Sequence, residues 1–184
     1  MKKAFFLSLC LFLLFSCSNQ KPEAEKTETT VAPAEVASTP QPAEIGDPKY
    51  MDIGKKGLAS LSAGDVDGWM NSYADNVVWQ WNNGDSLVGK AAVSDYWKKR
   101  RTEAIDSITF TNLIFLPLQV NQPQSIEQPG LWLLSWYNVN AKYKTGKRMT
   151  QAIHTDMHFN SADKIDRVVQ YLDRAPINAA MAKK

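Results

Sequence analysis

The residues best suited to chemistry form the pattern His154-x-Asp156-x-His158, which contains both histidines of the chain. A carboxylate can orient a neighbouring imidazole for acid–base catalysis. Metal binding is disfavoured, because two histidines four residues apart on a strand lie about 13 Å apart and cannot hold one ion together. A third interpretation is polar pairing with Tyr171 and Asp173 of the next strand, on a convex sheet face or at a dimer interface. We favour this pairing, keep catalysis as an alternative, and predict no metal site and no cofactor.

The remaining composition excludes several kinds of function. Both cysteines lie within the first 17 residues, so residues 18–184 contain no disulfide and no cysteine nucleophile. The formal net charge is only +2, with acids and bases interspersed, so we expect no nucleic-acid partner. The sequence also lacks a Ser-His-Asp phrase and a glycine-rich phosphate loop.

The N-terminal residues have the pattern of an export signal. Two lysines precede an apolar run at positions 4–15, which is too short to span a bilayer, and a small residue then precedes Cys17. Leu14-Phe15-Ser16-Cys17 resembles the lipobox of bacterial lipoproteins. The resemblance implies that residues 1–16 are removed as a signal peptide and that Cys17 is lipidated. The protein would then be anchored to a membrane of the bacterial cell envelope, with its domain facing the periplasm or the exterior.

A composition change divides the rest of the chain. Residues 17–46 are rich in Ala, Pro, Glu, Thr and Lys and contain no aromatic residue, which predicts a disordered tether. Tryptophans and regular apolar periodicity begin after that segment. Residues 47–184 therefore form one predicted domain of common size.

The order of predicted elements within this domain is that of an α+β protein. Helical periodicity runs from Asp47-Pro48 to Gly64, and a second helix runs from Asp65 to Asp75-Asn76. A strand at 77–81, a turn at 82–85 and a third helix after Gly89 follow. Four long strands are predicted near residues 105–120, 131–143, 149–159 and 165–173. Short Gly, Pro and Asn turns between them indicate an antiparallel meander.

Several phrases in this order resemble the SnoaL-like polyketide cyclase branch of the nuclear-transport-factor-2-like superfamily. They are Gly64-Asp65-Val66-Asp67, Tyr73-Ala74-Asp75-Asn76, Leu87-Val88-Gly89-Lys90, Thr145-Gly146-Lys147, Phe159-Asn160-Ser161-Ala162-Asp163 and Tyr171-Leu172-Asp173. The resemblance implies a cone: a curved antiparallel sheet wrapped by three helices, with a pocket in its mouth. It also implies that the convex sheet face forms a homodimer.

The catalytic residues of well-known relatives are missing here. The resemblance places the general base of ketosteroid isomerase at Trp81, its donor tyrosine at Gly57 and its protonated acid at Thr155. The aspartate of limonene epoxide hydrolase falls on Gln170. None of these four residues can carry out the corresponding proton transfer, so we expect neither activity.

Strand alternation then predicts which side chains face the cone. On residues 149–159 the apolar set should face inward, which leaves His154, Asp156 and His158 outside. The predicted pocket is lined by Trp69, Tyr73, Trp79, Trp81, Trp97, Thr155, Met157 and Gln170. These residues suit a small apolar or aromatic ligand, although the indoles could equally fill the cone as core.

Three functional hypotheses follow. The favoured one is a membrane-tethered module that binds a small apolar or aromatic molecule. The alternative is an enzyme of the isomerase, cyclase or hydrolase kind that uses His154, Asp156 or Asp173 as acid or base. The third is a structural dimer module with a filled cone.

Overall fold

The computed structural model describes residues 41–123 and 128–182. The predicted signal peptide, the lipidation site Cys17 and residues 18–40 of the predicted tether lie outside the described residues. Within the part of the chain that is described, no helix is long and apolar enough to cross a bilayer.

Local sequence signals place both ends of the first helix and the start of the second. The carboxylate of Asp47 accepts a hydrogen bond from the Lys49 backbone N–H at 2.8 Å, at the start of α1 (Lys49–Ala63). Gly64 ends α1 with φ of 85°, a left-handed conformation that suits glycine. Asp65 then caps α2 (Val66–Met70), because its carboxylate accepts the Gly68 N–H at 2.8 Å.

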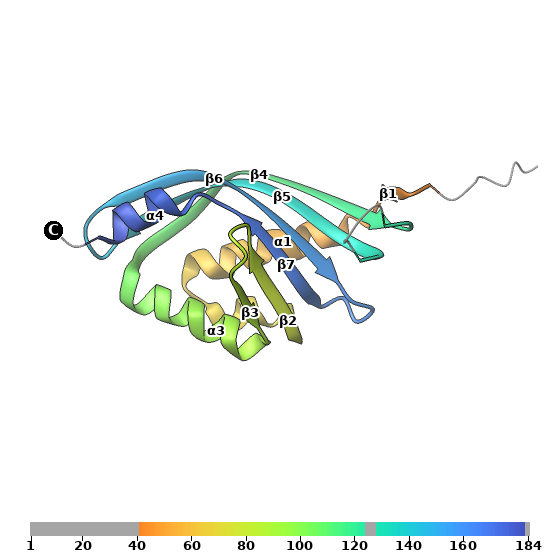
Figure 1. Cartoon of the computed structure of the whole chain (residues 1–184), viewed down its shortest axis with the longest axis horizontal. Coiled ribbons are helices and arrows are strands. Elements are labelled where there is room, and N and C mark those ends of the chain that lie inside the picture. Colours follow the sequence, from red (N-terminus) through yellow and green to blue (C-terminus); the bar gives the residue numbers. More distant parts are fainter. Residues whose placement is uncertain (1–40, 124–127, 183–184) are drawn as a thin grey trace, which may run out of the picture. The chain divides into compact units, whose positions relative to one another are not determined.

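The strands form one seven-stranded sheet with the order β1-β4-β5-β6-β7-β2-β3. Their bounds are β1 (Ala43–Ile45), β2 (Tyr73–Trp81), β3 (Ser86–Val88), β4 (Ile105–Val120), β5 (Gly130–Tyr143), β6 (Arg148–Phe159) and β7 (Ile165–Tyr171). Strands β4 to β7 form the predicted antiparallel meander, and β2 joins β7 in parallel. The α+β fold class is confirmed: the sheet is curved but unclosed, and it arches over the helices (Figure 1).

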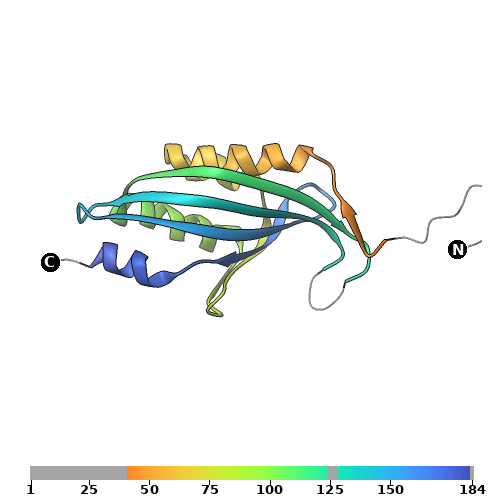
Figure 2. The same cartoon turned by 90° about the horizontal axis from the view of Figure 1, so that it is seen from above.

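Helix α3 (Lys90–Lys99) continues into one π-helical turn, η1 (Arg100–Ala104), and this turn leads directly into β4. Seen from above, α1 runs along one side of the long strands and α4 (Arg174–Met181) lies on the other side (Figure 2). Helix α1 packs closely against the sheet at Gly54, where an added Cβ would lie 2.7 Å from the Phe115 ring.

Three elements differ from the sequence-based expectation. Helix α2 ends at Met70 instead of near Asp75, because β2 already begins at Tyr73, which pairs with Ile165 of β7. Strand β1 lies inside the segment predicted to be a tether, and it pairs with the end of β4. Helix α4 was not predicted. Asp173, expected to extend the last strand, instead caps α4 by accepting the Ala175 N–H at 2.8 Å.

A bulge in β4 changes which face its side chains occupy. Thr111 pairs with Asn138 and Ile114 pairs with Trp136, so β4 uses one residue more than β5 over this stretch. The backbone of Asn112 has φ of 54°, a left-handed conformation that asparagine tolerates. As a result, Phe110 lies on the inner face, whereas Ile114, 59% exposed, lies on the outer face.

Candidate functional site

The inner face of the sheet contains a cavity of about 120 Å³. A dry apolar cavity of about 150 Å³ holds a benzene-sized molecule, so this space suits a single ring. Side chains of all four helices, η1 and strands β2 and β4 to β7 line it. Eight of them are aromatic: Trp69, Trp79, Trp81, Tyr96, Trp97, Phe110, Tyr137 and Tyr143.

The predicted pocket residues fall into two neighbouring groups. Trp69, Trp79, Trp81, Trp97 and Gln170 line the cavity itself. The other three line a smaller space of about 30 Å³, which Trp69 and Trp79 also border: Tyr73, Thr155 and Met157.

Contacts between the indoles fill much of the cone. The Trp69 ring meets Tyr73, Trp79 and Trp97 edge-on or nearly so, with centroids 5.3–5.7 Å apart. These pairs add packing energy to the burial of the rings. The core and pocket interpretations of the tryptophans therefore both apply, because the packed rings form the wall of the remaining cavity.

A hydrogen-bonded series of neutral side chains crosses the inner face of β2, β7, β6 and β5. Trp81 Nε1 donates to Gln170 Oε1 at 3.1 Å, and Gln170 Nε2 donates to Thr155 Oγ1 at 3.3 Å. The hydroxyls of Thr155 and Tyr137 lie 2.8 Å apart. We call these four residues the neutral relay. Burial raises the pKa of Tyr137, so its hydroxyl keeps its proton at neutral pH.

The neutral relay includes three of the positions at which the family resemblance predicts catalytic groups: Trp81, Thr155 and Gln170. Each of these side chains is at least 94% buried. Their hydrogen bonds satisfy one another, so the relay can position a polar group of a ligand but supplies no carboxylate for proton abstraction.

Among the described residues that line the cavity, the ionised side chains are two arginines. Arg174 forms an ion pair with Asp85 at 3.2 Å, and its guanidinium lies 5.2 Å from the Trp81 ring centroid. Arg100 lies over the rings of Tyr96 and Trp97, at 5.6 and 5.9 Å. Among the residues the structure describes, no carboxylate forms an ion pair with Arg100.

Two further polar side chains, Tyr143 and Asn178, border the cavity. Burial raises the pKa of Tyr143, and the neighbouring Arg100 opposes that rise. Asn178 of α4 also lines the cavity and is itself exposed. Sequence reasoning missed Arg100, Tyr137 and Arg174 as lining residues. Arg100 follows the basic residues at the end of α3, and Arg174 lies on the unpredicted helix α4.

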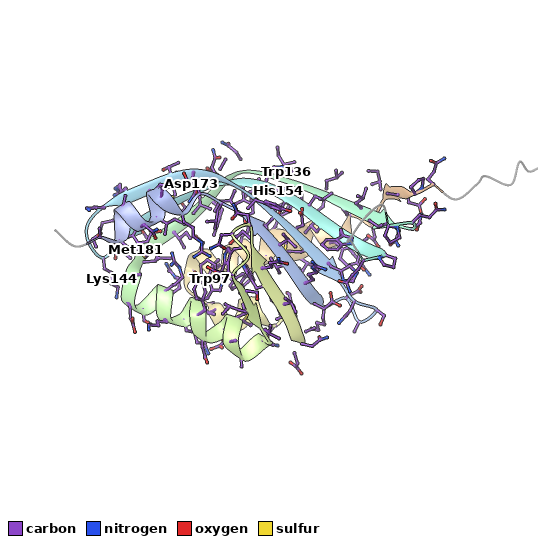
Figure 3. The ribbon with its side chains drawn as sticks, viewed as in Figure 1. Trp97, Trp136, Lys144, His154, Asp173 and Met181 are labelled. Carbon is purple, nitrogen blue, oxygen red and sulfur yellow. The ribbon has the colours of Figure 1, made fainter. Side chains whose placement is uncertain are left out.

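The histidine pattern divides into two separate pairs on the opposite face of the sheet. His154 Nε2 lies 2.8 Å from Asp156 Oδ1, and its ring stacks on Trp136 with centroids 4.6 Å apart. His158 instead contacts Asp166 through Nδ1 at 2.5 Å. Figure 3 shows His154 and Trp136 on the outer side of the sheet and Trp97 on the inner side.

The surroundings of the two histidine–aspartate pairs on the outer face indicate a structural role. Burial raises the pKa of Asp156, and the adjacent His154 opposes this rise. Tyr171 lies next to the His154 ring, with centroids 5.6 Å apart, as the pairing hypothesis expected. The sequence did not predict Asp166 as a partner of His158. A register shift between His158 and Phe159 disrupts the alternation there. In residues 41–123 and 128–182, no group of three or more His, Cys, Asp or Glu could hold a metal ion.

Solved structures with this fold have diverse assignments. A candidate polyketide cyclase from Xanthomonas campestris pv. campestris has a TM-score of 0.57 at 15% identity, covering 72% of this chain and 96% of its own. A protein from Catenulispora acidiphila with a ketosteroid isomerase-like fold, in complex with trimethylamine, has a TM-score of 0.53 at 10% identity, covering 72% and 94%. An LEH-like epoxide hydrolase from M. tuberculosis has a TM-score of 0.50 at 12% identity, covering 71% and 86%.

At these low sequence identities, the similarity shows a shared fold and does not show a shared activity. No curated protein sequence matches the chain. The SnoaL-like domain profile matches residues 56–168, which is more than half of the chain. That stretch runs from the middle of α1 to the centre of β7 and includes most of the cavity lining. The chain therefore belongs to the SnoaL-like domain family.

Proposed function

We propose that this protein is a lipid-anchored binding module of the bacterial cell envelope that holds a small aromatic molecule in its cavity. The observation that carries the proposal is the combination of an aromatic wall with the neutral relay at the family's catalytic positions. The wall provides flat apolar surface for a ring, and the relay provides hydrogen-bonding groups without an acid or base.

The alternative hypothesis of an acid–base enzyme lacks a site in the cone. His154 and Asp156 lie on the outer face, and Asp173 is engaged as the cap of α4. None of the three lines the cavity. A reaction in the cavity would need a proton acceptor that its lining does not contain.

The test is a titration with single-ring compounds, followed by calorimetry and by tryptophan fluorescence. We expect toluene, phenol or benzoate to bind the wild-type protein and to change its fluorescence, because the ring would exclude water from the indoles. Ala141 lines the cavity and is 4% exposed, so Ala141→Leu should fill part of the space and abolish this response. Overpacking would cost about 1–3 kcal/mol of stability, which thermal melting can follow.

The matched control is Ala59→Leu, which makes the same change on the exposed side of α1. It should leave both binding and fluorescence unchanged. Absence of binding by every compound, or equal binding by Ala141→Leu and wild type, would contradict the proposed function.

A further inference from the structure

The charged side chains that line the cavity, among the described residues, are all positive. In the part of the chain that the structure describes, two arginines border the cavity and no aspartate, glutamate, histidine or lysine does. A cavity that only had to hold an apolar ring would gain nothing from a cation. The desolvation of a half-buried guanidinium costs free energy unless an anion or a set of acceptors compensates it.

The two arginines are not equivalent. The charge of Arg174 is already balanced by Asp85, and the same guanidinium lies 3.4 Å from the side-chain oxygen of Asn83. The contacts of Arg100 with the described residues are made with neutral groups: the faces of Tyr96 and Trp97, the sulfur of Met181 at 3.9 Å and the hydroxyl of Tyr143. Within residues 41–123 and 128–182, Arg100 is thus the cavity arginine without an ion pair.

The position of Arg100 suits it to bind a ligand group at the end of a ring. It begins η1, the π-helical turn between α3 and β4, and such turns recur at functional sites. Its guanidinium lies over aromatic rings that also form the cavity wall, so a bound ring and Arg100 would share this surface. Asn178 borders the same space from α4 and can add an amide donor.

We infer that the ligand is a single-ring aromatic carboxylate whose carboxyl group binds Arg100 while its ring fills the aromatic cavity. A guanidinium matches a carboxylate with two parallel hydrogen bonds, which a neutral amide or ester cannot reproduce. The volume of about 120 Å³ limits the apolar part to one ring. This inference rests on the proposed binding function and adds the charge and chemical class of the ligand.

The experiment compares benzoate with uncharged benzamide and with cationic benzylamine by calorimetry on the wild-type protein. A charge-assisted hydrogen bond should favour benzoate over benzamide by about 10- to 100-fold, and benzylamine should bind least. Arg100→Met keeps the apolar stem but removes the charge. It should weaken benzoate binding by a similar factor and change benzamide binding by less than about threefold.

Two more variants make the result specific. Arg100→Lys keeps the charge without the planar fork, so benzoate affinity should fall between those of wild type and Arg100→Met. Lys99→Gln removes the neighbouring positive charge from the exposed side of α3 and should change neither affinity. Melting temperatures of all variants verify that the fold is retained.

The possible outcomes separate the two proposals. Equal affinity for benzoate and benzamide, or an equal effect of Arg100→Met on both, would overturn the carboxylate inference and leave the binding function standing. If no ring compound binds at all, both fail together. A preference for benzylamine would overturn the charge assignment alone.

Discussion

The neutral relay makes a quantitative prediction about stability. Thr155 is 3% exposed, and its hydroxyl lies between two partners, the Tyr137 hydroxyl at 2.8 Å and the Gln170 amide at 3.3 Å. Thr155→Val replaces this hydroxyl by a methyl group of similar shape. Tyr137 then loses its hydrogen bond to Thr155, while Gln170 keeps its bond to Trp81.

The size of the stability loss follows from the two groups that lose a hydrogen bond to Thr155: the Tyr137 hydroxyl and the Gln170 amide. A buried polar group without a partner costs about 1–3 kcal/mol. The loss for the Gln170 amide should be at the low end of this range, because its bond to Thr155 is long. Burying the new methyl group recovers about 1 kcal/mol. We therefore expect Thr155→Val to lower the free energy of unfolding by about 1–3 kcal/mol, or the melting temperature by about 2–12 °C.

A double-mutant cycle with Tyr137→Phe tests the cause. Tyr137→Phe alone leaves the Thr155 hydroxyl with its bond to Gln170, so it should cost about 1 kcal/mol. The double variant removes both hydroxyls, so no tyrosine hydroxyl is left unpaired. Its cost should be about 1 kcal/mol smaller than the sum of the two single costs.

The assay is urea denaturation followed by tryptophan fluorescence and far-UV circular dichroism, with the denaturant slope expected to stay constant. Ser135→Ala is the control, because Ser135 is fully buried but its hydroxyl donates to the Thr155 backbone carbonyl at 2.6 Å, outside the relay. It should combine additively with Tyr137→Phe. The reasoning is refuted if Thr155→Val costs less than about 0.5 kcal/mol or if the cycle shows no coupling.

Four other predictions concern the rest of the chain. Cys17→Ala should release the protein from membranes after a high-salt wash without changing its far-UV spectrum; continued sedimentation with membranes would contradict lipidation. A chain starting at residue 39 should unfold independently of reductant, whereas one starting at residue 47 should lose about 1–3 kcal/mol in urea denaturation, because the β1 hydrogen bonds to β4 are removed. We expect the outer sheet face to pair two copies, so Tyr171→Glu, at a side chain 47% exposed, should lower the dimer fraction in sedimentation; a wild-type monomer at high concentration would exclude this dimer. Burial raises the pKa of Tyr73 well above 10, so the folded state keeps a proton that the unfolded state loses. Stability should therefore fall above pH 10 by about 1.4 kcal/mol per pH unit for this group, and Tyr73→Phe should reduce that slope in urea denaturation at pH 9–11.5.

The sequence predicted the meander closely because its signals are long and mutually consistent. The four strands alternate over many residues and are separated by strong turn formers, and their observed bounds differ from the predicted ones by at most two residues. The same alternation correctly assigned Thr155, Met157 and Gln170 to the inner face and His154 to the outer face.

The misses have local causes. Strand β1 has only three residues, all exposed. Its pairing with β4 stabilises it, and its own residues show no strand pattern. Helix α4 contains Pro176, which the first turn of a helix tolerates but which hides the helical signal. The role of Arg100 could not be predicted, because it depends on how η1, α4 and β5 meet in space.

The bulge at Asn112 has a consequence for changes of chain length. Before it, even-numbered residues of β4 such as Ile108 and Phe110 face the cone; after it, Ile114 and Leu116 face outward and Phe115 contacts α1. The extra residue accounts for this change of parity, so deleting Asn112 would remove the bulge and leave both faces of the strand as they are. A one-residue insertion in the second half has no such compensation and would exchange the two faces beyond it. The phenyl ring against Gly54 would then lie in water, and exposed isoleucine and leucine would face the helix. At this point in mid-strand the chain should therefore tolerate the loss of one residue better than the gain of one.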